Sequence, residues 1–141
     1  MAKSGPIIII EDDNDDIEIL SKVLHELRVK NELLAFSDTT KAFAFLKETS
    51  SRPFLIFCDV NLPGENGLEF KQKIDDDIDL RRKSIPFIFY STSADQASID
   101  KAYTGMTVQG FFEKGVSYEE IMDDIGAVVN YWKRCKHPNI Y

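Results

Sequence analysis

The sequence has few cysteines and no long apolar run, and both absences narrow the possibilities. Its only cysteines, Cys58 and Cys135, cannot form a disulfide framework, and Cys58 lies in a predicted buried strand. No stretch approaches the ~20 apolar residues that a membrane span requires. The start, MAKSGPIIII, has one lysine and too short an apolar run for a signal peptide. We therefore expect a cytoplasmic protein with no membrane partner.

Positive charge is also scarce, because 17 Lys and Arg residues face 24 Asp and Glu residues, which gives a net charge of −7. This balance argues against binding to a nucleic-acid backbone or to anionic lipid. What is present is an ordinary soluble composition, 43% hydrophobic and 29% charged. The 141 residues contain no repeat, low-complexity segment or linker. We expect residues 1–141 to form one domain that leaves no room for a DNA-binding output domain.

Short apolar runs alternate with helical patterns five times along the chain. Such alternation predicts parallel strands joined by right-handed crossovers, with helices on both faces of the sheet. The expected fold class is α/β, a flavodoxin-like doubly wound (βα)5 domain with a five-stranded parallel sheet in the order 2-1-3-4-5. The expected strands are Ile7–Ile10, Leu33–Phe36, Phe54–Cys58, Pro86–Tyr90 and Val108–Phe112.

Several local features of the helices are also predicted. Asp13 or Asn14 should cap the first helix, and Ser117 with Glu120 fits a capping box. The helix from Gly67 should bury Ile78, and the tract DDDIDLRRK, which spans the end of that helix and the following loop, is interpreted as a solvated connection. At the end of the last helix, Tyr131 and Trp132 are interpreted as core residues.

Polar side chains follow four of the predicted strands at the point where each strand ends. In the order 2-1-3-4-5 these carboxyl ends share one rim, and strands one and three end side by side, where open α/β sheets place their ligands. The residues at these positions are Glu11 and Asp12, Asp59, Ser91 and Thr92, and Lys114. Each residue alone is as well explained by a turn, a cap or a solvated lysine. Their coincidence at one rim favours a functional site.

The chemistry of this set favours a divalent cation and phosphoryl transfer. Crowded carboxylates repel one another, and a cation relieves the repulsion. Oxygen ligands with no His or Cys nearby suit Mg²⁺ or Mn²⁺ and do not suit zinc. Lys114 can pair with Asp59 or with a phosphoryl oxygen, and Ser91 or Thr92 offers a hydroxyl donor. Asp59 is then the expected nucleophile.

From Ile7 to about Trp132 the chain resembles the receiver domain of two-component response regulators, a chemotaxis-Y-like domain. The segments that carry the resemblance are IIIIEDD, IFCDVNLPGENG, PFIFYSTSA and GFFEKG. The resemblance implies a phosphoacceptor at Asp59, a lysine at Lys114 and Mg²⁺ (or Mn²⁺) bound by Glu11, Asp12, Asp59 and the backbone carbonyl of Asn61, with Asp13 as a less direct acid. It further implies a switch hydroxyl at Ser91, a switch aromatic at Phe111, an access position at Thr92 and a rate-modulating position at Ser93.

The resemblance also implies a role. A stand-alone receiver takes a phosphoryl group from a sensor histidine kinase or a histidine phosphotransfer protein, and it catalyses only its own phosphorylation and dephosphorylation. Its downstream partner binds the face made by helix 4, strand 5 and helix 5 of the family's fold. The chain departs from the family at Gly115, where a proline is usual, so we expect a trans peptide there. Phe111 also lacks a hydroxyl.

Three other functions are considered from the same residues. A haloacid-dehalogenase-type phosphatase also has a strand-terminal Asp nucleophile with Mg²⁺, but it needs a second Asp two residues later, where this chain has Asn61. A flavodoxin-like cofactor binder would need a phosphate loop where this chain has EDDNDD, whose charge repels phosphate. A phosphorylation-independent interaction module on a receiver fold remains open, given Gly115.

Overall fold

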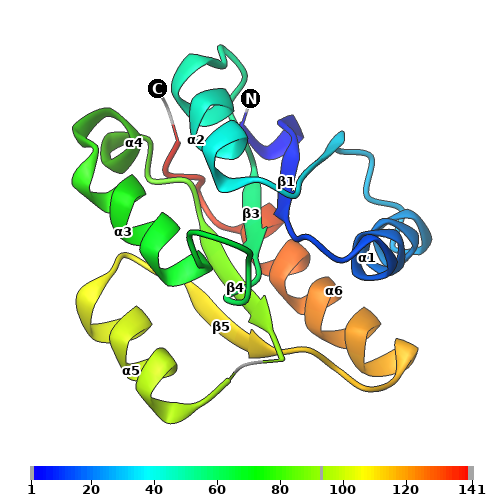
Figure 1. Cartoon of the computed structure of the whole chain (residues 1–141). Coiled ribbons are helices and arrows are strands. Elements are labelled where there is room, and N and C mark those ends of the chain that lie inside the picture. Colours follow the sequence, from blue (N-terminus) through cyan, green and yellow to red (C-terminus); the bar gives the residue numbers. More distant parts are fainter. Residues whose placement is uncertain (1, 93, 140–141) are drawn as a thin grey trace.

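The protein folds into one five-stranded parallel sheet with helices on both faces (Figure 1). The structure is a computed structural model that describes residues 2–92 and 94–139. The strand order is β2-β1-β3-β4-β5, and every neighbouring pair is parallel. The predicted fold class is therefore confirmed. The strands are β1 (Ile7–Ile10), β2 (Leu33–Phe36), β3 (Leu55–Cys58), β4 (Phe87–Ser91) and β5 (Gly110–Glu113).

The helices form a layer on each face of the sheet. They are α1 (Asn14–Glu26), α2 (Thr39–Glu48), α3 (Gly67–Asp76), α4 (Ile78–Lys83), α5 (Gln96–Gly105) and α6 (Tyr118–Arg134), preceded by a 3₁₀ turn, η1 (Ala2–Ser4). One core cluster joins the sheet to α2, α3, α4 and α5, and the other joins it to α1 and α6. Figure 1 shows the same division. Among the described residues, no helix has the length and apolar character needed to cross a bilayer.

Acidic side chains begin several helices. Asp13, a predicted cap, accepts hydrogen bonds from the N–H groups of Asp15 and Asp16 in α1. Asp95 accepts the N–H of Ser98 in α5. At α6, Ser117 accepts from the N–H of Glu120, but the Glu120 carboxylate accepts from the N–H of Val116 and not from that of Ser117. The reciprocal capping box predicted there is therefore incomplete. A complete one begins α3, between Asn66 and Glu69.

The tract after α3 is helical, so its interpretation as a solvated connection was wrong. Asp77 ends α3 and caps α4, because its side chain accepts the backbone N–H of Leu80 at 3.0 Å. Leu80 is buried in the core, whereas Ile78, the predicted inner residue, is 76% exposed. The break at Asp77 rotates the apolar stripe, since α4 starts a new helix with its own inward face. Ser84, in the left-handed conformation, ends α4.

Two smaller predictions also need correction. Strand β5 begins at Gly110, two residues later than predicted from Val108. At the end of α6, Trp132 packs against the α1–α6 core as predicted, but Tyr131 is 63% exposed and is not a core residue. Both errors occur where burial is only partial, so the apolar pattern carries a weak signal.

Candidate functional site

Asp59 leaves the end of β3 beside the end of β1. Its backbone N–H donates to the carbonyl of Ile10 at 3.0 Å, which extends the β1–β3 pairing by one residue. The carboxylate therefore lies next to Glu11, as the predicted strand order requires. The loop that follows returns to Asp59, and a Cβ atom at Gly67 would lie 2.1 Å from the carbonyl oxygen of Asp59. Only glycine permits this close approach of α3 to the end of β3.

Both carboxylate oxygens of Asp59 accept hydrogen bonds. Oδ1 accepts from the Ser91 hydroxyl at 2.6 Å and from the Asn61 N–H at 3.0 Å, while Oδ2 accepts from Lys114 Nζ at 3.0 Å. Burial favours a raised pKa, but these three donors together bring the pKa of Asp59 below its ordinary 3.8. Asp59 is thus a buried, ionised carboxylate at neutral pH, which is the state a nucleophile needs.

Lys114 makes ion pairs with three carboxylates at once. Its Nζ lies 2.7 Å from Glu11 Oε2, 2.7 Å from Asp16 Oδ2 and 3.0 Å from Asp59 Oδ2. Burial would lower the pKa of Lys114, but the hydrogen bonds to Asp16, Glu11 and Asp59 raise it above 10.5. The lysine is therefore a fixed positive charge. Asp16 lies in the first turn of α1, where an acidic side chain is expected without any lysine partner, and it was not among the predicted site residues.

Glu11, Asp12 and Asp59 form an acidic cluster whose ligand oxygens all lie within 4.8 Å of one another. Glu11 is buried, and burial raises its pKa to about 7 although Lys114 opposes the shift. A buried carboxyl of this kind is stabilised in its charged form by a nearby cation. The donors are all oxygens, so the residues fit Mg²⁺ or Mn²⁺.

The other predicted site residues differ in their surroundings. Thr92, which follows β4, and Asn61 are both exposed. The ring of Phe111 is partly buried, 5.3 Å from the ring of Phe89. Asp13 uses its carboxylate to cap α1, with Oδ1 accepting the Asp15 N–H at 2.8 Å. Ser93 lies outside the described residues.

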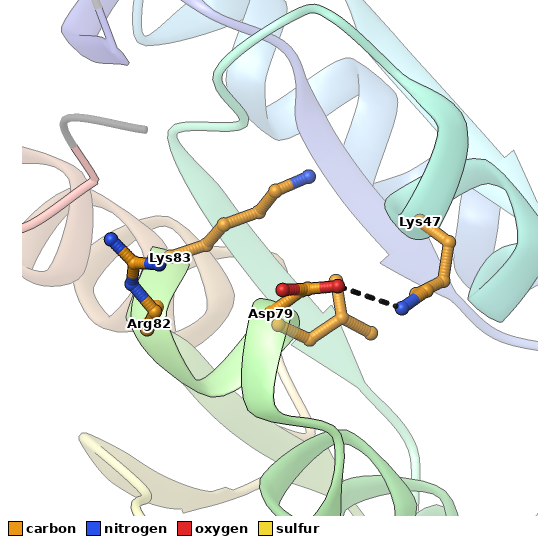
Figure 2. A pocket seen from close by; sticks show the side chains of 5 residues that line it. Lys47, Asp79, Arg82 and Lys83 are labelled. Atoms are coloured by element: carbon orange, nitrogen blue, oxygen red, sulfur yellow. Dashed lines mark hydrogen bonds and ion pairs between the residues drawn. The ribbon is translucent and has the colours of Figure 1, made fainter.

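A separate pocket of about 270 Å³ lies between the end of α2 and α4 (Figure 2). It is lined by Lys47, Asp79, Leu80, Arg82 and Lys83. Lys47 is 3.3 Å from Asp79 and 3.0 Å from Asp77, and Lys83 donates to the carbonyl of Leu46 at 2.9 Å. Helix α2 leads into the amino end of β3, and α4 leads into the amino end of β4. The pocket therefore lies at the amino ends of the strands, whereas Asp59 lies at their carboxyl ends. Its two lysines are bound within the chain, and we assign it no ligand.

Comparison with known proteins decides the family. A family model of the response regulator receiver domain matches residues 7–126. The chain belongs to the response regulator receiver domain family. Within the described residues the peptide between Lys114 and Gly115 is trans, as expected for a receiver without the usual proline.

Individual relatives agree with this family. The response regulator Rcp1 of Synechocystis sp. is 28% identical over 131 residues, which cover 89% of this chain and 87% of Rcp1. The crystal structure of the phosphorylated cyanobacterial phytochrome response regulator RcpA is similar with a TM-score of 0.81 and 28% identity, over 92% of this chain and 94% of that one. The Mn²⁺-bound form of Rcp1 gives a TM-score of 0.80 and 26% identity, over 93% and 96% of the two chains.

Proposed function

We propose that this receiver accepts a phosphoryl group on Asp59, from a phosphohistidine of a sensor kinase or a histidine phosphotransfer protein. The observation that carries the proposal is the buried, ionised carboxylate of Asp59, with the hydroxyl of Ser91 on one oxygen and the ammonium of Lys114 on the other. A carboxylate oxygen of Asp59 forms the new bond to phosphorus as the bond from phosphorus to the histidine nitrogen breaks. The electron pair of that bond leaves with the imidazole.

The residues that would hold Mg²⁺ (or Mn²⁺) are Glu11, Asp12 and Asp59, together with the backbone carbonyl of Asn61. A bound divalent cation neutralises charge on phosphoryl oxygens. Lys114 and Ser91 donate to the same group of oxygens, so the charge that builds up during transfer is met by fixed donors. The Mn²⁺-bound form of Rcp1 and the phosphorylated form of RcpA are precedents in two relatives.

Phosphorylation then changes which protein the domain binds. Ser91 ends β4, and Phe111 lies in β5, which pairs with β4. A shift of the Ser91 hydroxyl toward a phosphoryl group therefore changes the position of β4 relative to the strand that carries Phe111. We place the contact with the downstream partner on the face of α5, β5 and α6. These elements correspond to helix 4, strand 5 and helix 5 of the family's fold, because the additional short helix α4 shifts the numbering by one. The domain acts on no substrate other than its own phosphoryl group. Its buried free thiol at Cys58 suits a reducing cytoplasm.

Incubation with acetyl phosphate and Mg²⁺, followed by intact mass measurement, tests the proposal. We expect one phosphoryl group on the wild type and none on Asp59→Asn or in the presence of EDTA. Label that survives Asp59→Asn, or that needs no divalent cation, would contradict the assignment. Turnover of a generic phosphate ester would instead favour a phosphatase, although Asn61 lacks the carboxyl that such an enzyme needs.

A further inference from the structure

We propose that Asp16 is a positioning residue, which holds the ammonium group of Lys114 at the phosphorylation site when Glu11 and Asp59 are engaged by a cation. The inference rests on the proposed function, and it adds a residue on α1 to that site. It starts from the three ion pairs of Lys114.

A lysine ammonium has three N–H donors, and Lys114 has three carboxylate partners. Glu11 and Asp16 are each 2.7 Å from Nζ, and Asp59 is 3.0 Å away. Each donor thus has one acceptor, and the ammonium is saturated before any phosphoryl group arrives. The position of Lys114 during phosphorylation therefore depends on which of the three carboxylates remains hydrogen-bonded to it.

Two of the partners change their role when the site is loaded. Glu11 and Asp59 belong to the cluster whose ligand atoms lie within 4.8 Å, and Asp16 is outside it. A cation held by the cluster shares the charge of Glu11 and Asp59 and repels the nearby ammonium. Phosphorylation further converts Asp59 into an uncharged acyl group. Asp16 is the partner that keeps its full charge throughout.

The local structure suits Asp16 to this task. It lies in the first turn of α1, which the Asp13 side chain caps by accepting the N–H groups of Asp15 and Asp16. Its side chain is 33% exposed, against 10% for Lys114 and 3% for Glu11. Water can therefore solvate Asp16 while it pairs with Lys114, so this pair does not depend on a cation beside Asp16.

Lys114 needs such a partner because it reaches far from its own strand. It follows β5, an edge strand, and β4 separates β5 from β3, which carries Asp59. After Lys114 the chain turns into Gly115 and the exposed Val116. A long side chain that crosses a neighbouring strand without a tether has many alternative rotamers. Asp16 approaches from α1 and restrains the ammonium group at 2.7 Å from its carboxylate.

In the phosphorylated state the same tether leaves one donor for the phosphoryl group. Asp16 retains one N–H group of Lys114, and the donor that pointed at Asp59 turns to a phosphoryl oxygen. Removal of the Asp16 charge takes away the one partner of the Lys114 ammonium group that does not also bind the cation. Binding of a phosphoryl group should weaken as a result, even when the cation site is saturated.

The test measures the affinity for beryllofluoride, a phosphoryl mimic, by ¹⁹F NMR in saturating Mg²⁺. We expect Asp16→Asn to weaken binding by about tenfold, which corresponds to about 1.4 kcal/mol. Asp15→Asn is the matched control, because Asp15 lies in the same turn, is exposed and loses the same charge; its affinity should stay within twofold of wild type. In a Lys114→Met background, Asp16→Asn should change the affinity by less than twofold.

Each other outcome overturns the inference. Equal weakening by Asp15→Asn and Asp16→Asn would indicate net charge alone, and tighter binding by Asp16→Asn would make Asp16 a competitor of the phosphoryl group. An effect that persists without Lys114 would show that Asp16 does not act through it. Thermal unfolding verifies the fold of each variant. If Asp16→Asn does not fold, Asp16→Ser, which also removes the carboxylate, takes its place with the same expected result. If the wild type fails to bind beryllofluoride, or Asp59→Asn binds it, the proposed function itself is wrong.

Discussion

The hydroxyl of Ser91 donates to Oδ1 of Asp59 across 2.6 Å, and Ser91 is fully buried at the end of β4. The two side chains end adjacent parallel strands, β3 and β4. Oδ1 of Asp59 is therefore linked to β4 through Ser91, and Oδ2 is linked to the end of β5 through Lys114. We therefore expect a new group on Asp59 to change both contacts and, through them, β4 and β5.

Removal of the Ser91 hydroxyl should separate phosphorylation from its consequence. Ser91→Ala keeps the acceptor, the acidic cluster and Lys114, so we expect acetyl phosphate still to label it fully, but more slowly than wild type because one donor to the transferred group is lost. The change in hydrogen exchange that beryllofluoride produces over α5, β5 and α6 should largely disappear, because the phosphoryl group has no hydroxyl to draw toward it. Ser91→Thr, which keeps a hydroxyl, is the control. An undiminished exchange response in Ser91→Ala would remove Ser91 from the switch.

Mg²⁺ should stabilise the fold through Asp12. Binding to the folded state alone adds about 2.7 kcal/mol at a concentration 100 times the dissociation constant. We expect the melting temperature of the wild type to rise with Mg²⁺ and that of Asp12→Asn to change little, because Asp12 is one of three clustered ligands.

Asp13→Asn is the matched control for this measurement. The substitution Asp13→Asn removes the same charge one position later in the sequence. The Asp13 side chain caps α1, and Asn is an equally good cap. The Mg²⁺ response should survive in this variant. A response lost in Asp13→Asn and kept in Asp12→Asn would reverse the assignment of the two acids.

The sequence pattern predicted the strands well because three of them, β1, β3 and β4, are short apolar runs that are buried throughout. A run of four or five apolar residues between turn signals is too short for a helix and indicates a strand. The sequence pattern predicted the rim because the strand order alone brings Asp59, Ser91 and Lys114 together. It failed at α4, because the cap at Asp77 lies inside a run of three aspartates and nothing in composition marks which one ends a helix. It missed Asp16 for a similar reason: an acid in a first turn suits the helix dipole whether or not a lysine from β5 reaches it.

A buried ion pair on α3 supports a prediction on stability. Lys71 Nζ lies 2.9 Å from Asp75 Oδ1, both side chains are 4% exposed, and Asp75 also accepts the N–H and hydroxyl of Thr107. The network ties α3 to the segment before β5. Lys71→Met should lower the free energy of unfolding by about 3 kcal/mol, because Asp75 is left as a buried charge without its cation.

Urea unfolding measures this effect, with Lys73→Met as the control on the same helix. Lys73 is more exposed and its ion pair with Glu65 is long, at 3.7 Å, so its loss should cost at most about 1 kcal/mol. Similar losses for Lys71 and Lys73 would mean that the buried pair contributes no more than a surface one.

The chain after α6 gives a pH-dependent prediction. His137 Nε2 is 2.7 Å from the carbonyl of Phe54, and its Nδ1 accepts the N–H of Asn139 at 3.1 Å. This pair of contacts requires a neutral ring with its proton on Nε2. Burial lowers the pKa of His137 below 6.5; the hydrogen bond to Phe54 opposes this shift, and the charge of Lys3 adds to it.

Because the folded state has the lower pKa, the unfolded state binds the proton first as the pH falls. The contribution of His137 to stability is therefore complete above pH 6.5 and is lost as the pH falls through the folded-state pKa. His137→Gln keeps a donor for the Phe54 carbonyl but does not titrate. The difference in unfolding free energy between wild type and His137→Gln, measured in urea, should shift in favour of the variant between pH 8 and pH 5.5. His25→Gln removes the other histidine, which is exposed, and should leave the fall in stability with pH that comes from His137 in place. A constant difference between wild type and His137→Gln across this range would show that protonation of the ring does not disturb the contact with Phe54.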